Sequence, residues 1–137
     1  MLFDTTALIG AIRNPSRLAW LRRSAGSPRY YLTSVTIAEL HSGARTTQQA
    51  FLIEQLARLF ARDGRLLTPT ADEWSAAGRM IARAIIRSGA MEPRDHYPDA
   101  LIVQIAGRME AAIITDNVGD LRGWIALGRL NATIADS

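Results

Sequence analysis

The chain has 137 residues, of which 48% are hydrophobic and 21% are charged, and its formal net charge is +3. This balance is typical of one folded domain and excludes a disordered chain. Because cysteine and lysine are both absent, the sequence excludes zinc–thiolate sites and thiol nucleophiles and argues against Walker-type phosphate loops and Schiff-base enzymes.

The beginning of the chain predicts one strand and two helices. Residues 1–4 are largely apolar and predict a short buried strand. The pattern over residues 5–12 predicts a helix that a threonine caps and the Asn14-Pro15 pair ends. A second helix is expected over residues 16–24. The side chains of this second helix that we expect to face the interior are Leu18, Trp20 and Leu21.

The next part of the chain predicts two more strands, each beside a helix. Residues 30–32 are aromatic and apolar, which suits a strand, and threonine and serine caps then open a helix that carries Glu39 and ends near Gly43. Residues 48–62 have leucines at helical spacing, and residues 65–67 predict the third strand. Strands and helices therefore alternate through the first half of the chain.

The longest predicted helix opens with a capping-box sequence, Thr70-Ala71-Asp72-Glu73, and ends at a Ser-Gly pair. The expected buried face of this helix consists of Trp74, Ala77, Ile81 and Ile85. Residues 90–96 predict a loop. Pro98 is suited to the start of the following helix, which runs to about Met109.

Two further strands, at residues 111–115 and 132–134, complete the pattern. Strands that alternate with helices predict an α/β fold, a single domain over residues 1–137 with a mostly parallel central sheet of about four to five strands and helices on both faces. In such sheets the functional groove lies beyond the carboxyl ends of the strands. No apolar run reaches the length of a membrane span and no signal peptide is visible, so we expect a cytoplasmic protein without membrane association.

Four acidic residues stand beside apolar sequence, where an unpaired buried carboxylate is unfavourable. They are Asp4, Glu39, Asp99 and Asp116. Two follow predicted strands and two lie near helix starts, so we expect all four on one rim of the sheet. Two carboxylates about 4 Å apart repel by roughly 4 kcal/mol at an effective dielectric of 20. Such a cluster either stays partly protonated or is neutralised by cations. Oxygen ligands alone favour Mg²⁺ or Mn²⁺, which can activate a water for phosphodiester hydrolysis.

Each of these acids, taken singly, also has a purely structural explanation. Asp4 is placed to cap the first helix, and Thr36 and Glu39 match a capping box. Asp99, in a first helical turn, complements the helix dipole, and Asp116 suits a turn. The metal-site hypothesis depends on the coincidence of all four beside apolar sequence.

Four short motifs occur in a fixed order along the chain. They are Phe3-Asp4-Thr5-Thr6-Ala7-Leu8-Ile9, Thr36-Ile37-Ala38-Glu39-Leu40, Asp99-Ala100-Leu101-Ile102 and Ile114-Thr115-Asp116-Asn117-Val118-Gly119-Asp120-Leu121. This order resembles the PIN-domain ribonucleases, and among them the VapC-like toxins of bacterial toxin–antitoxin pairs. The resemblance spans almost the whole chain. It implies a PIN fold, a magnesium-dependent endoribonuclease with an RNA substrate, a small cognate antitoxin and a homodimer.

The resemblance places the metal and the catalytic chemistry on the acidic residues. Asp4 and Asp99 are implied as principal metal ligands, with Glu39 beside them. Asp116 is the preferred fourth acid, and Asp120 is the second choice for that position. The candidate substrate-binding residues around these acids are Thr6, Arg94, Thr115 and Asn117.

Two other functions are compatible with the sequence. A non-catalytic PIN-like module would bind RNA or a protein partner through its arginines, which supply all sixteen basic residues. An Asp-nucleophile phosphatase is a weaker alternative, because the second aspartate of its opening motif is replaced by Thr6 and the chain has no lysine. Dependence on a metal separates the nuclease from the binding module.

Overall fold

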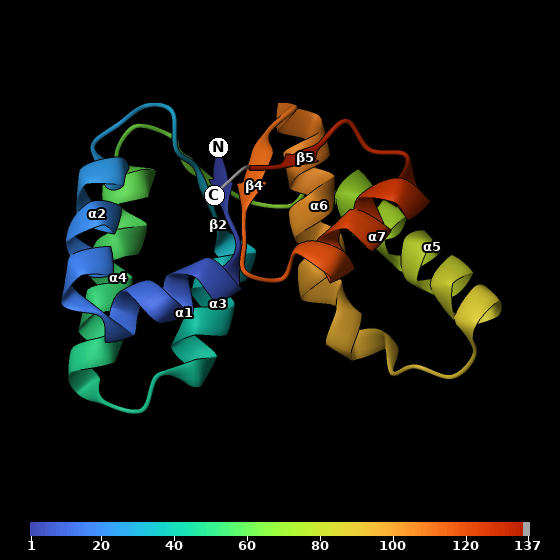
Figure 1. Ribbon diagram of the computed structural model, residues 1–137, viewed down its shortest axis with the longest axis horizontal. Helices are drawn as coiled ribbons and strands as arrows, with labels where there is room; N and C mark the ends of the chain where they lie inside the picture. The colour runs from blue at the N-terminus through green and yellow to red at the C-terminus, as the bar shows by residue number, and fades with distance from the viewer. Residues whose placement is uncertain (136–137) are drawn as a thin grey trace.

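Strands and helices alternate along the chain in the computed structural model, which describes residues 1–135 (Figure 1). The strands are β1 (Leu2–Phe3), β2 (Leu32–Thr33), β3 (Leu66–Leu67), β4 (Ala112–Ile114) and β5 (Thr133–Ile134). The helices are α1 (Thr5–Arg13), α2 (Pro15–Ala25), α3 (Ser34–Gly43), α4 (Thr47–Ala61), α5 (Ala71–Ser88), the 3₁₀ helix η1 (Pro93–His96), α6 (Tyr97–Met109) and α7 (Val118–Gly128). Within the described range, no helix is both long and apolar enough to cross a membrane.

All strand pairs are parallel. β1, β4 and β5 form one sheet in the order β1-β4-β5, and β2 pairs with β3. A parallel bridge between Leu2 and Tyr31 joins the two pieces, and the Tyr31 N–H donates to the Met1 carbonyl at 2.7 Å. The spatial order is therefore β3-β2-β1-β4-β5, which confirms the predicted parallel sheet.

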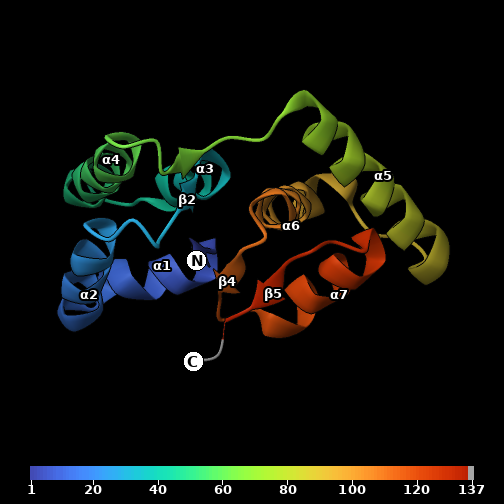
Figure 2. The same ribbon diagram turned by 90° about the horizontal axis from the view of Figure 1, so that it is seen from above.

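Helices cover both faces of the sheet, as predicted. Figure 2 shows α1, α2 and α4 on one side of the strands and α5, α6 and α7 on the other. Two buried clusters fill the interior, one around Phe3 and Phe60 and the other around Ile113 and the apolar side of α6. Leu2 and Phe3 are neighbours in β1 and point into different clusters, as alternate strand residues do.

Local sequence signals account for several helix boundaries. Thr70 Oγ1 accepts the Glu73 N–H at 3.1 Å, and Glu73 Oε1 accepts the Thr70 N–H at 2.9 Å, which confirms the predicted capping box of α5. Asn14 follows α1, and its side chain caps α2, whose first residue is Pro15. These caps satisfy backbone N–H groups that have no partner within the helix.

The turn after α6 reverses the chain, so that α6 runs antiparallel to the strand that follows it. Glu110 adopts a left-handed conformation with φ of 50° and ends α6, and the Ala111 N–H donates to the Ala106 carbonyl at 2.9 Å. The chain reverses here and enters β4. The start of α6, with Asp99 in its first turn, therefore lies at the same end of the molecule as the carboxyl ends of the strands.

Two helical elements were not predicted from the sequence. The sequence did not predict α7, because this helix contains Gly119, Gly123 and Gly128, and glycine disfavours an isolated helix. Tertiary packing compensates, since Leu121 and Trp124 of α7 are buried. The loop predicted over residues 90–96 contains η1, whose first turn begins with a proline.

The predicted burial of two tryptophans was wrong. Trp74 is 51% exposed because the buried face of α5 begins one residue earlier, at Glu73, which pairs with Arg108 at 2.9 Å. Trp20 is 38% exposed and places its ring edge against Phe3, with 5.5 Å between the ring centroids.

Candidate active site

Asp4 directly follows β1 and is only 1% exposed. Its Oδ2 accepts hydrogen bonds from the hydroxyls of Thr6 at 2.8 Å and Thr115 at 2.7 Å. No residue of the described range donates to Oδ1. The side chain makes no capping bond to α1, so the capping explanation for Asp4 is wrong. The two hydroxyls fix the carboxylate in one orientation and leave Oδ1 for another group.

The same two threonines join the carboxyl ends of β1 and β4. Their hydroxyl oxygens lie 3.2 Å apart. Thr6 Oγ1 accepts the Asp116 N–H at 3.0 Å, and Thr115 Oγ1 accepts the Asn117 N–H at 2.8 Å. Thr6 and Thr115 were predicted as substrate-binding residues, and in the structure their hydroxyls position Asp4.

Glu39 faces this region from α3. The Thr5 hydroxyl donates to Glu39 Oε1 at 2.5 Å. Burial raises the pKa of Glu39, the hydrogen bond from Thr5 opposes that rise, and the negative charge of Asp4 adds to it. Thr33 caps α3 by accepting the Thr36 N–H at 3.1 Å, so the capping box predicted for Thr36 and Glu39 is wrong.

Asp99 is the most strongly perturbed acid of the group. Burial, which is the largest cause, and the charges of Asp4, Glu39 and Asp120 together raise the pKa of Asp99 to about 6, although His96 lowers it. The structure therefore brings these four carboxylates into one electrostatic site. Three of them are acids that the sequence placed together, and Asp120 is the second choice for the fourth position.

Asp116, the preferred fourth acid, points elsewhere. Its side chain is 62% exposed, and its Oδ2 lies 4.0 Å from Arg17 Nη1. It lines a surface hollow with Trp20 on the α1–α2 side of the molecule. Asp120, in the first turn of α7, instead lines a hollow of about 360 Å³ together with Asp99. The geometry thus favours Asp120 as the acid that faces the others.

The acids suit a hard divalent cation in their chemistry, although they do not enclose one. Among residues 1–135, no three His, Asp or Glu side chains form a ready-made metal site. Mg²⁺ is commonly held by one or two carboxylates and keeps several of its waters. Asp4 and Asp99 fit this mode, since no residue among 1–135 donates a hydrogen bond to Oδ1 of Asp4. A cation would relieve the carboxylate repulsion that helps to raise the pKa of Asp99.

Two further residues bear on the site. Arg94 is exposed on η1 and lines a hollow with Glu39 and Tyr97. Thr5 was predicted only as a possible helix cap, and its contact with Glu39 was missed. The available signal was a second hydroxyl directly after Asp4, but its direction depends on how α1 packs against α3.

The state of Asp99 predicts a pH-dependent stability for the metal-free protein. Its carboxyl group has a pKa of about 6 when folded, against an ordinary value of 3.8 for an aspartate. The folded state therefore holds this proton more tightly, and the free energy of unfolding falls as the pH rises from about 4 to about 6. Asp99→Asn should raise the free energy of unfolding at neutral pH by about 1 kcal/mol, after allowance for solvent screening and the lost helix-dipole interaction.

Thermal unfolding in EDTA measures this effect. At neutral pH the melting temperature of Asp99→Asn should exceed that of the wild type by about 3–5 °C, and the difference should vanish near pH 4. Asp72→Asn is the matched control, because Asp72 lies exposed in the first turn of α5 and away from the acid cluster. Equal melting temperatures for wild type and Asp99→Asn at neutral pH would contradict the electrostatic assignment.

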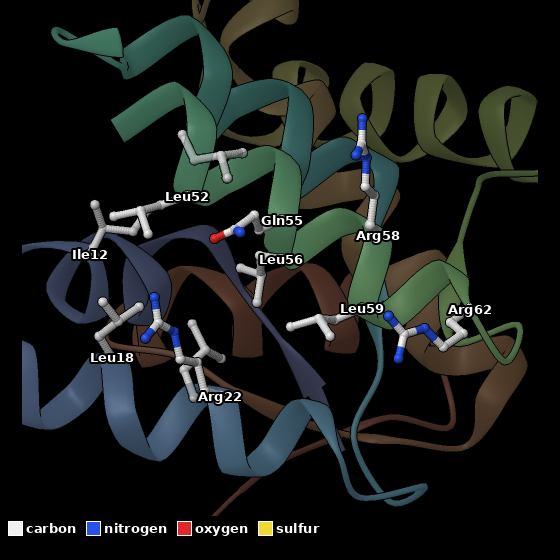
Figure 3. Close-up of a pocket in the computed structure, with 11 residues that line it drawn as sticks. Ile12, Leu18, Arg22, Leu52, Gln55, Leu56, Arg58, Leu59 and Arg62 are labelled. Atoms are coloured by element: carbon white, nitrogen blue, oxygen red, sulfur yellow. The ribbon is translucent and has the colours of Figure 1, made fainter. Parts of the chain in front are cut away.

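A separate groove of about 480 Å³ lies between α1, α2 and α4 (Figure 3). Much of its lining is apolar, and three arginines belong to it. The apolar residues include Ile12, Leu18, Leu52, Leu56 and Leu59, and the arginines are Arg22, Arg58 and Arg62. None of these residues belongs to the acid cluster, so the groove is a second surface feature.

Comparison with known proteins agrees with the fold. The family model described as the PIN domain matches residues 1–119. The structure is similar to a chain in the crystal structure of VapBC2 from Rickettsia felis bound to a DNA fragment from their promoter, with a TM-score of 0.63 and 17% sequence identity over 99% of this chain and 97% of that chain. No curated protein sequence gives a significant match. The chain belongs to the PIN-domain family.

Proposed function

We propose that this PIN domain is a Mg²⁺- or Mn²⁺-dependent endoribonuclease and that it acts as the toxin of a toxin–antitoxin pair. The observation that carries the proposal is the acid cluster at the carboxyl end of a parallel sheet. There the charges of Asp4, Glu39 and Asp120 help to raise the pKa of Asp99 to about 6. Clustered carboxylates of this kind are stabilised by a divalent cation.

The residues divide the chemistry among them. Asp4 and Asp99 would hold the ion, with Thr6 and Thr115 keeping the Asp4 carboxylate in place. When bound, the ion lowers the pKa of a water molecule and offsets the negative charge that develops on the phosphate. Glu39, with its raised pKa, is suited to accept the proton that the attacking water loses.

The acid cluster favours this function over a non-catalytic RNA-binding module. Carboxylates repel the phosphates of RNA unless a cation lies between them, so they weaken binding in a module that has no use for the metal. The chain has a net charge of +3, and all sixteen of its basic residues are arginines. This charge suits a polyanionic substrate.

We assign the groove between α1, α2 and α4 to binding of the antitoxin. Its apolar lining and its three arginines fit an amphipathic helix that presents an apolar stripe flanked by acidic residues. The similar VapBC2 structure is itself that of a complex bound to promoter DNA. A groove remote from the acids would let a partner bind firmly with one segment and cover the active site with another.

Expression in bacteria tests the toxin assignment. The wild-type chain should arrest growth and produce newly cleaved RNA, whereas Asp99→Asn, expressed at the same level, should do neither. Co-expression of the protein encoded next to it should restore growth. Arg22→Glu, in the groove, should remain toxic but escape this rescue, because its charge would repel an acidic partner. Growth arrest by Asp99→Asn equal to that of the wild type would refute the proposed activity.

A further inference from the structure

An exposed tryptophan stands beside the acid cluster. Trp74 is 51% exposed, yet its backbone is firmly held, because the Thr70–Glu73 capping box and the Glu73–Arg108 ion pair fix the first turn of α5. Leaving half of a large aromatic side chain in water forgoes hydrophobic stabilisation. A rigid element therefore presents the indole to solvent.

Trp74 lines a hollow of about 440 Å³, which is within the range of roughly 300–1,000 Å³ found for small-ligand sites. Glu39 of the acid cluster lines the same hollow. The ring of Tyr97 lies 5.9 Å from that of Trp74 between centroids, at an interplanar angle of 42°. Tyr97 and Pro98 directly precede Asp99, so the hollow borders the proposed cleavage site.

The hollow also contains a positively charged side chain. Arg94 is the one basic side chain among the described residues that line it, and no acid of residues 1–135 pairs with that arginine. Aromatic faces that stack on bases, with an arginine for the phosphate, are the elements by which proteins bind single-stranded nucleic acid. Here both line the same hollow as Glu39 of the acid cluster.

We propose that the Trp74–Arg94 hollow binds the nucleotide next to the scissile phosphate of a single-stranded RNA, with the base stacked on the indole and its phosphate paired with the guanidinium. The inference rests on the proposed nuclease function and deepens it by naming the strand type and a subsite. Bases in a duplex are stacked on one another and do not reach the indole, so the hollow selects unpaired RNA.

Binding of a short fluorescein-labelled single-stranded RNA of mixed sequence tests the stacking. Fluorescence anisotropy is measured with Mg²⁺ present and in the Asp4→Asn background, so that bound RNA stays intact. Trp74→Ala should weaken binding about 5- to 100-fold, and Trp74→Phe should retain most of the affinity. Phe51→Ala is the matched control, because Phe51 is an exposed aromatic residue of α4 outside the hollow, and it should change nothing.

The salt dependence tests the arginine. Arg94→Gln should reduce the slope of log affinity against log salt by about 0.7, the value for one phosphate contact to a single strand. Arg23→Gln removes an exposed arginine of α2 outside the hollow and should leave the slope unchanged. A strand of equal length that lacks bases should bind equally well to the Trp74→Ala protein and to the protein that retains Trp74.

The outcomes separate this inference from the proposed function. Cleavage of RNA by the wild type combined with unchanged binding by Trp74→Ala would overturn the subsite alone. A wild type that neither binds nor cuts RNA would overturn both. If Trp74→Ala instead alters the oligomeric state in light scattering with unchanged RNA affinity, Trp74 is a contact between copies of the chain and the inference fails.

Discussion

Asp4→Asn should slow RNA cleavage by about 10³-fold and leave the fold intact. The asparagine amide can still accept the hydroxyl bonds that Thr6 and Thr115 donate at 2.8 and 2.7 Å. It loses the negative charge, however, and with it several kcal/mol of stabilisation that a correctly held metal gives to the transition state. Each 1.4 kcal/mol or so corresponds to about a tenfold change in rate.

Single-turnover cleavage of a single-stranded RNA in Mg²⁺ measures this rate, and thermal unfolding verifies the fold. Asp72→Asn again serves as the control, because it removes an exposed carboxylate of α5 without touching the acid cluster. It should cleave at the wild-type rate. A folded Asp4→Asn protein that retains a rate close to that of the wild type would show that the buried carboxylate is structural.

Asp120→Asn should slow cleavage by about 10- to 100-fold, and Asp116→Asn should have little effect. The reason is the direction of the two side chains. Asp120 adds its charge to those that raise the pKa of Asp99, whereas Asp116 is 62% exposed and lies 4.0 Å from Arg17. Loss of a carboxylate beside the metal disturbs the ligands that hold it.

The same single-turnover assay ranks the two variants. Arg17→Gln removes the partner of Asp116 and is the control for any indirect effect at the α1–α2 side. It should cleave like the wild type. The opposite ranking, with Asp116→Asn the slower enzyme, would return the fourth position to Asp116 and show that its side chain turns toward the acids when the metal binds.

The positions of Asp4 and Asp99 could be predicted because local signals define them. Asp4 ends a short apolar strand, and Asp99 stands in the first turn of a helix opened by Tyr97-Pro98. In a parallel α/β fold the ends of strands and the starts of the following helices meet at one edge, so sequence order alone places such residues together.

The rest of the site depends on tertiary packing. Asp116 and Asp120 are four residues apart, and only the placement of α7 turns Asp120 toward Asp99. That helix could not be predicted from its glycine-rich sequence, because packing of Leu121 and Trp124 stabilises it. The exposure of Trp74 likewise depends on which neighbouring residue of α5 turns inward.

Cleavage of single-stranded RNA by the purified wild-type protein in Mg²⁺, in EDTA, and in EDTA followed by excess Mg²⁺ tests the central claim most directly. Cleavage should stop in EDTA and recover fully when Mg²⁺ is restored, and Asp4→Asn protein purified in the same way should remain about 10³-fold slower than the wild type in Mg²⁺. Cleavage that continues at the same rate in EDTA would contradict a metal-dependent site built from Asp4, Glu39, Asp99 and Asp120.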